Sequence, residues 1–142
     1  LFLISEMIGY LDYYIIVYRY VGKTFNVCVT GAAGQIAYSF LPQLCKGSVF
    51  PGVNINLRLL DITPALNVMK GVALELEDCS YPLLKSEKNI YLGFFSDKAE
   101  DQFKDADIIV FIGGQPRKPG MERKDLLHLN KLIFVEQSKA LK

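Results

Sequence analysis

The strongest constraint on the fold of this chain is the alternation of strand-like and helix-like segments. Residues 25–30, 54–61, 89–95 and 107–112 are short strand-like runs, FNVCVT, NINLRLLD, NIYLGFF and DIIVFI. Between them lie segments with apolar residues at helical spacing or, before the last strand, the run KAEDQFKD at residues 98–105, which is predicted to be a short polar helix. Strands that alternate with helices form parallel sheets with right-handed crossovers. The sequence therefore predicts an α/β fold.

Two of the connecting segments, residues 35–46 and 65–79, are predicted helices with one apolar face. Apolar residues recur in them three and four positions apart. The predicted inward-facing residues are Ile36, Phe40, Leu41 and Leu44 in the first helix and Leu66, Met69, Ala73 and Leu76 in the second. Pro42 falls inside the first helix, where it removes a backbone donor, so we expect this helix to be kinked or shortened.

The strand at residues 107–112, DIIVFI, is apolar throughout after its first residue. Such a run is typical of a strand covered on both faces of a sheet. A further helix is predicted to begin near residue 122 and to continue to the end of the chain.

The first strand runs into a glycine-rich loop, TGAAGQIA, at residues 30–37. Gly31 and Gly34 hold the first two positions of a G-x-x-G-x-x-G/A pattern, and Ala37 holds the third. Glycines here allow a tight turn and a close approach of backbone amides to a pyrophosphate, which the start of the helix then holds. In this strand–turn–helix context the loop predicts a Rossmann-type, doubly wound parallel sheet that binds a dinucleotide. The predicted contacts are Gly31, Ala32, Ala33, Gly34, Gln35, Ile36 and Ala37.

An acidic residue, Asp61, closes the second strand at the distance expected for a ribose partner. Its carboxylate can accept hydrogen bonds from the adenosine ribose and would repel a 2′-phosphate. We therefore predict NAD rather than NADP as the cofactor. The alternative is that Asp61 only caps the turn in DITP.

The loop after the last strand, GGQPRKPGMERKDLL at residues 113–127, combines flexible and stiff residues. Its glycines (Gly113, Gly114 and Gly120) are candidate hinges around a piece stiffened by two prolines. Arg117 and Arg123 are predicted to bind the substrate, because guanidinium groups recognise carboxylates with two parallel hydrogen bonds. The alternative is a solvated basic loop in which Arg123 pairs with Asp125 or Glu122.

Several segments together resemble the cytosolic type of the malate dehydrogenase family. They are VTGAAGQIAYSFL, GSVF, LLDI, GVALELEDCSYPLL, FKDADIIVFIGG and PRKPGMERKDLL, and the resemblance covers residues 25–142. It implies NAD-dependent interconversion of malate and oxaloacetate in the cytoplasm, by a protein that is a homodimer when complete.

The resemblance also implies roles for individual residues. Arg117 resembles the arginine that selects the distal carboxylate of the substrate, which lactate-oxidising relatives lack. Arg123 resembles the arginine that polarises the substrate oxygen. Asn130 and Gln137 match positions that contact NAD.

The family's catalytic histidine and its aspartate partner are expected beyond residue 142, so no catalytic residue is predicted within this chain. His128 is the only histidine present, and we interpret it as a surface or interface residue. We expect the chain to be a fragment of the enzyme, incomplete at its C-terminus and inactive alone. Residues 25–142 would form its dinucleotide-binding domain.

Residues 1–24 form a separate apolar extension of uncertain status without a counterpart in the family. Charged residues interrupt it, which makes it a poor membrane span, and it lacks the marks of a signal peptide. The formal net charge of the whole chain is +1, which argues against a nucleic-acid partner. Cys28, Cys45 and Cys79 have no metal-site spacing and are predicted to be small buried thiols.

Two other functions fit parts of the sequence. The glycine loop also resembles that of extended short-chain dehydrogenases and epimerases, whose Tyr-x-x-x-Lys spacing is met by Tyr81 and Lys85. That pair, however, comes before the third strand, and Pro82 follows the tyrosine. A non-catalytic NAD-binding module is the other alternative, and it leaves the two arginines of the loop unexplained.

Overall fold

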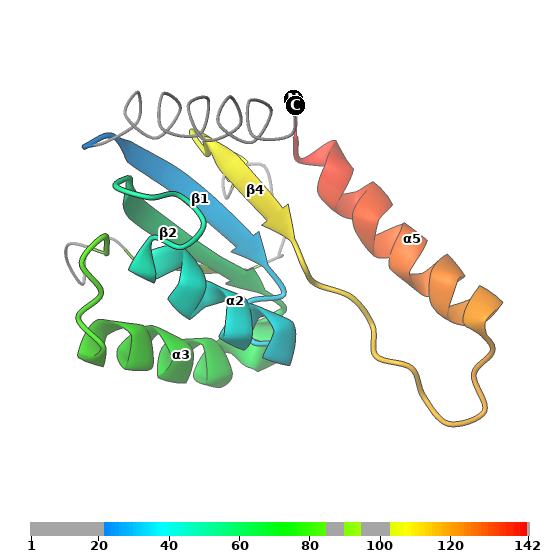
Figure 1. Ribbon diagram of the computed structural model, residues 1–142. Coiled ribbons are helices and arrows are strands. Elements are labelled where there is room, and N and C mark those ends of the chain that lie inside the picture. Colours follow the sequence, from blue (N-terminus) through cyan, green and yellow to red (C-terminus); the bar gives the residue numbers. More distant parts are fainter. Residues whose placement is uncertain (1–21, 85–89, 95–102, 142) are drawn as a thin grey trace, which may run out of the picture.

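The computed structural model describes residues 22–84, 90–94 and 103–141 (Figure 1). Its elements are β1 (Thr24–Thr30), α2 (Gln35–Lys46), β2 (Asn54–Asp61), the short 3-10 helix η1 (Thr63–Ala65), α3 (Leu66–Asp78), β3 (Ile90–Phe94), β4 (Ile108–Phe111) and α5 (Arg123–Lys139). The four strands of the described part form one parallel sheet in the order β3-β2-β1-β4. This arrangement confirms the predicted Rossmann-type α/β fold.

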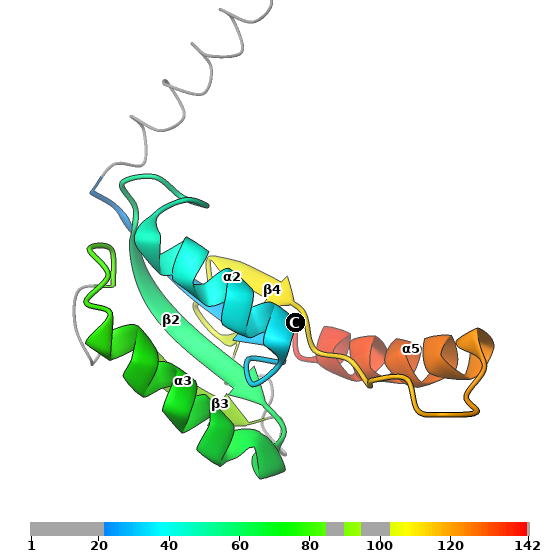
Figure 2. The ribbon, with the colours of Figure 1, turned by 60° about the horizontal axis from the view of Figure 1, so that its bottom comes forward.

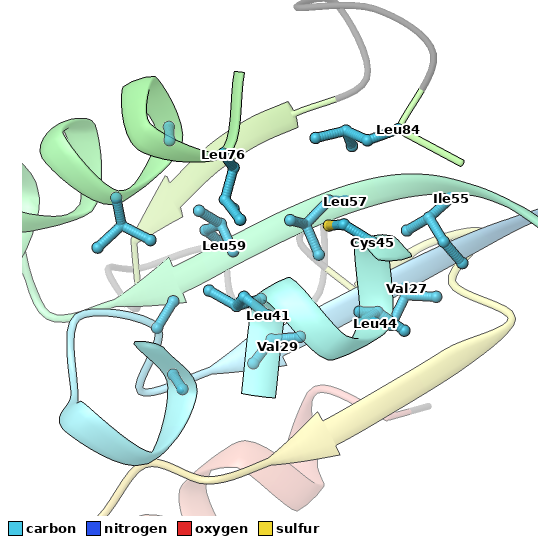
Figure 3. Close-up of a cluster of buried hydrophobic side chains, with 14 of the residues drawn as sticks. Val27, Val29, Leu41, Leu44, Cys45, Ile55, Leu57, Leu59, Leu76 and Leu84 are labelled. Atoms are coloured by element: carbon cyan, nitrogen blue, oxygen red, sulfur yellow. The ribbon is translucent and has the colours of Figure 1, made fainter. Parts of the chain in front are cut away.

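One face of the sheet is covered by α2 and α3 (Figures 1 and 2). Alternate side chains of β1 and β2 point into this layer, where Val29 and Leu57 are fully buried. Figure 3 shows Leu41 and Leu44 of α2 and Leu76 of α3 gathered over the same strands. Burial of these aliphatic side chains supplies the main stabilisation of the domain.

The opposite face has a smaller buried cluster. Cys28 and Leu60 contribute to it from the sheet, Phe103 from the crossover before β4, and Ala140 from just beyond α5. The Phe111 ring on β4 lies edge-on to the rings of Phe103 and of Phe134 on α5. Buried clusters on both faces are what a doubly wound sheet requires.

Strand β4 differs in part from its prediction. Ile108 and Val110 pack against the first cluster, and Ile109 and Phe111 against the second, so the strand does contact both layers. All four side chains are nevertheless only half-buried. The reason is that β4 is at the edge of the described sheet, with β1 as its one neighbour there.

The helices follow the predicted ranges, but one residue of the apolar face of α2 and the expected shortening of that helix need correction. Ile36 is 71% exposed, and Ala37 takes the buried position beside it. Pro42 does not shorten the helix, which continues to Lys46 and ends at Gly47 in the left-handed conformation. Its fixed φ is compatible with a helix, and it removes only one hydrogen bond.

Two other expectations need adjustment, and two segments are not tested. Helix α5 ends at Lys139, short of the predicted end. Cys28 and Cys45 are buried as predicted, but Cys79 is exposed beyond the end of α3. Most of the predicted polar helix at residues 98–105, and residues 1–21 of the apolar extension, lie outside the described residues. No helix in the described part of the chain is long and apolar enough to cross a membrane.

Candidate dinucleotide site and its lid

The candidate site lies at the carboxyl ends of the three neighbouring strands β2, β1 and β4. Thr30, the last residue of β1, pairs with Leu60 on one side and Phe111 on the other. The residues that follow, Gly31, Asp61 and Ile112, therefore emerge next to each other. The order of the strands reverses between β1 and β4, and open α/β sheets bind their ligands at such a switch point.

Gly31 is required by both its backbone conformation and its surroundings. Its φ is +67°, which L-residues rarely adopt. A Cβ atom added here would lie 2.3 Å from the Cα atom of Gly113, just beyond β4. The glycine-rich loop at residues 30–37, called the phosphate loop below, is thus in direct backbone contact with the start of the loop that follows β4.

The start of α2 carries backbone donors without partners. Gly34 is the N-cap residue and offers no side-chain cap. The Gly34 N–H donates to the Gly31 carbonyl at 2.9 Å, which closes the turn. Within the described residues, no hydrogen bond uses the N–H groups of Gln35, Ile36 or Ala37. Unpaired amides at the positive end of a helix form an anion-binding site.

Helix α5 shows the contrasting arrangement. Its N-cap residue, Glu122, and Asp125 form a capping box, in which the Asp125 carboxylate accepts a hydrogen bond from the Glu122 N–H at 3.2 Å. Of these two helices, only α2 begins without a capping box.

Asp61 contacts the phosphate loop directly. Its Oδ2 accepts a hydrogen bond from the Ala33 N–H at 2.9 Å, and its Oδ1 accepts one from the Ile62 N–H at 2.8 Å. Each carboxylate oxygen has a second acceptor site free for a further donor. Asp61 therefore holds the glycine loop in shape through these two bonds, and its carboxylate keeps acceptor sites for further donors.

The loop after β4, residues 112–122, leaves the sheet and turns back into α5 (Figures 1 and 2). We call this loop the lid. Two of its three glycines are held by neighbours rather than free. Gly113 lies against Gly31, and a Cβ atom on Gly114 would lie 3.0 Å from Oδ1 of Asn130. Gly120 has a φ of +79° and no atom within 4 Å of such a Cβ position. Of the predicted hinges, only Gly120 has free space around it.

The two arginines of the loop lie in different settings. The Nε–H of Arg117 donates to the Met121 carbonyl at 3.1 Å, which folds the tip of the loop onto itself. Arg123 is the first residue of α5. It makes no ion pair with the described residues, and Glu122 pairs instead with Lys124 at 2.9 Å. The local pairing of Arg123 considered from the sequence is therefore not formed, and both side chains are exposed.

The remaining candidates are on α5. The Oδ1 of Asn130 accepts a hydrogen bond from the Gln115 N–H at 2.7 Å. Gln137 is 6% exposed, and its buried Oε1 has no hydrogen-bond partner among the described residues. A buried polar atom without a partner is costly and points to a missing ligand or neighbour. His128 is exposed, as predicted for a surface residue.

Two contacts of the site were not predicted from the sequence: the approach of Gly113 to Gly31, and the bond from Gln115 to Asn130. A glycine directly after an apolar strand is a weak signal for the first. The second joins residues on two different elements and has no local signal.

Comparison with known proteins agrees with this geometry. The model of the lactate/malate dehydrogenase NAD-binding domain matches residues 25–142. The chain belongs to the lactate/malate dehydrogenase family. NAD is the cofactor of this domain family, and the loop between β1 and α2 lies within the matched region.

Curated relatives include the cytoplasmic malate dehydrogenases of Gallus gallus, 50% identical over 121 residues, and of Rattus norvegicus, 51% identical over 117 residues. These alignments cover 84% and 82% of this chain but 34% and 33% of the relatives. The chain thus spans about a third of the length of these relatives.

Solved structures show the same fold. Malate dehydrogenase from Naegleria fowleri superposes with a TM-score of 0.74 at 38% identity, over 85% of this chain and 36% of that one. Lactate dehydrogenase from Trichomonas vaginalis, in complex with NADH and oxamate, superposes with a TM-score of 0.69 at 35% identity, over 82% of this chain and 34% of that one. The likeness to this family leaves the short-chain dehydrogenase interpretation without support. Lys85 lies outside the described residues, and Tyr81 is in the turn after α3.

Proposed function

We propose that this chain is the dinucleotide-binding part of a cytoplasmic, NAD-dependent malate dehydrogenase, which interconverts malate and oxaloacetate. The observation that carries the proposal is the contact between Gly31 and Gly113. It places the root of the arginine-bearing lid beside the phosphate loop. A bare nucleotide-binding module has no use for such a lid, whereas a dehydrogenase of a dicarboxylic acid does.

The cofactor would lie across the carboxyl ends of β1 and β2. The unpaired amides of Gln35, Ile36 and Ala37 would bind the pyrophosphate, with Gly31, Ala32, Ala33 and Gly34 forming the loop beneath it. Asp61 would accept the ribose hydroxyls, and its charge would disfavour a 2′-phosphate. Asn130 and Gln137 would contact the cofactor from α5, and the unpartnered Oε1 of Gln137 supports this role.

The substrate would be bound by the lid. Arg117 would leave the Met121 carbonyl and form two parallel hydrogen bonds with the distal carboxylate. Arg123 would polarise the oxygen of the reacting carbon. When the lid closes, water leaves the site, and these charged contacts become stronger.

Oxidation of malate also requires a base that removes the hydroxyl proton while NAD accepts the hydride. None of the described residues near the loop fits this role. We propose that the base is a His–Asp pair in the part of the relatives that this chain does not span. We also propose that the complete protein is a homodimer, as the resemblance implies.

Lactate dehydrogenation is the second candidate, because the lactate dehydrogenase of Trichomonas vaginalis has 35% identity to this chain. Arg117 favours malate over lactate, since a positive charge opposite the methyl group of a lactate molecule would have no partner.

The first experiment is titration of the 142-residue chain with NADH, followed by fluorescence, and then an oxaloacetate turnover assay on the same sample. Binding without turnover is the expected result. A folded chain that does not bind NADH would contradict the proposed cofactor contacts. Turnover of oxaloacetate would contradict the placement of the base outside this chain.

A further inference from the structure

The stem of the lid, residues 113–115, is held more firmly than its glycines suggest. Gly113 fits against Gly31 only because neither residue has a side chain. One residue further, Gly114 leaves just enough room for the side chain of Asn130. The main chain of the stem is therefore packed between the phosphate loop and α5.

The hydrogen bond between Gln115 and Asn130 completes this arrangement. The Gln115 N–H donates to Oδ1 of Asn130 at 2.7 Å, across 15 residues of sequence. A backbone N–H can only donate, so the oxygen of the amide group, and not Nδ2, must be the atom that meets the Gln115 N–H. Within the described part of the chain, Nδ2 has no hydrogen-bond partner, so it stays free to donate to a ligand.

The position of Arg117 depends on this bond. Only Pro116, with its fixed φ, separates Gln115 from Arg117. The tip of the lid, residues 117–121, is closed by two hydrogen bonds. The Arg117 Nε–H donates to the Met121 carbonyl, and the Met121 N–H donates to the Lys118 carbonyl. A stiff tip joined to a fixed stem takes its direction from the stem.

We propose that Asn130 is a positioning residue for the lid: its Oδ1 holds Gln115 and thereby sets the direction in which Arg117 leaves the sheet. The inference rests on the proposed function for the meaning of Arg117, but the contact itself is independent of any substrate. Because Nδ2 of the same side chain is left to donate to a ligand, one residue would join the lid to the cofactor.

The test is amide hydrogen exchange in the 142-residue chain, measured by NMR at Gln115. Asn130→Leu has a similar volume but accepts no hydrogen bond, and should speed exchange at Gln115 by about fivefold or more. Asn130→Asp keeps the acceptor and should leave the rate close to that of the parent chain. The Met121 amide is the internal control, because its partner Lys118 belongs to the tip.

Equal exchange rates at Gln115 in the parent chain and in Asn130→Leu would overturn the proposal, as would an equal increase in Asn130→Asp. If Asn130→Leu does not fold, Asn130→Ala replaces it. This substitution also removes the acceptor and adds no bulk, so it should also speed exchange at Gln115. An unchanged rate there would likewise contradict the proposal. The exchange rate at Gln115 is measured without NADH or substrate. Failure of the positioning role would therefore appear in this rate, whereas failure of the proposed function would appear as a loss of NADH binding.

An activity arm in the complete protein separates positioning from cofactor contact. Asn130→Leu should raise the KM for both oxaloacetate and NADH, because it loses the acceptor and the Nδ2 donor. Asn130→Asp keeps the acceptor, so it should raise the KM for oxaloacetate less than Asn130→Leu does. If both variants raise only the KM for NADH, Asn130 is a cofactor contact alone and the positioning role is wrong.

Discussion

At the scale of single residues, Gly31 and Gly120 show that a positive φ can serve two different purposes. Both have left-handed backbones, at +67° and +79°. At Gly120 the space around the missing side chain is open, so glycine serves only the turn. At Gly31 the backbone of Gly113 fills that space, so glycine serves both the turn and the contact between two loops.

The pair gives a matched test of the contact. Gly120→Ala should lower the free energy of unfolding by about 1 kcal/mol, the ordinary cost of a left-handed alanine. Gly31→Ala should cost about 2 kcal/mol more, because backbone atoms must also move, and it should abolish NADH binding. Urea denaturation measures the first effect and fluorescence titration the second. Equal losses of stability in the two variants would contradict the proposed role of the contact.

Asp61 combines two roles that substitution can separate. Asp61→Ser should reduce the preference for NADH over NADPH by about tenfold, since the charge that repels a 2′-phosphate is lost. It should also loosen the loop, because the bond to the Ala33 N–H is removed. Asp61→Asn is the control, since it removes the charge but keeps one acceptor oxygen for that N–H. Unchanged selectivity in Asp61→Ser would remove Asp61 from the ribose role.

At the scale of elements, the sequence predicted helices and strands well and the contacts between loops poorly. The periodicity of α2 and α3 follows from burial on one face of a sheet, so it is visible in the sequence. Ile36 was misassigned because the face of α2 that packs on the sheet passes through Ala37, Leu41 and Leu44, and Ile36 lies off that face. The bond between Gln115 and Asn130 depends on how α5 packs, which no local pattern encodes.

The cysteines show how burial in an element controls chemistry. Cys28 lies in β1 and Cys45 in α2, and burial raises the pKa of each thiol from 9.0 to about 12, with nearby Arg58 lowering that of Cys28 slightly. Cys79 is exposed beyond α3. At pH 8 a thiol reagent should therefore modify Cys79 rapidly and the other two only after unfolding in urea. A Cys79→Ser variant should show no rapid phase; rapid labelling of two or more thiols in the folded parent chain would contradict this burial.

The same shifts fix the direction of a pH effect on stability. The folded pKa values of Cys28 and Cys45 exceed the unfolded ones, so the folded chain holds these protons more tightly. Their contribution to the free energy of unfolding is complete below pH 9 and is lost as the pH rises toward 12. Two tyrosines act in the same direction. The pKa of Tyr38 is raised mainly by its hydrogen bond to Glu75, and the pKa of Tyr81 is raised mainly by its hydrogen bond to Cys79.

At the scale of the whole molecule, the chain contains the proposed cofactor site and the proposed lid but spans about a third of the length of its relatives. The half-buried β4 and the exposed apolar side chains of α5, such as Leu127 and Leu132, agree with this partial coverage. If Arg117 has the proposed role, these residues carry one determinant of substrate choice, namely the charge that meets the distal carboxylate.

Arg117→Gln in the complete protein tests that role. Loss of one charge-assisted pair with the distal carboxylate should lower kcat/KM for oxaloacetate by about 100-fold. The kcat/KM for monocarboxylic 2-oxo acids should fall little or should rise, since the substitution removes an unpartnered charge opposite their apolar end. Arg117→Lys is the control. It keeps the charge but cannot form two parallel hydrogen bonds, so its kcat/KM for oxaloacetate should fall between those of the parent protein and Arg117→Gln.

The affinity for NADH should be unchanged in both variants, because Arg117 bonds to Met121 and not to the phosphate loop. If Arg117→Gln still prefers oxaloacetate over pyruvate by the same factor as the parent protein, the specificity resides outside this lid.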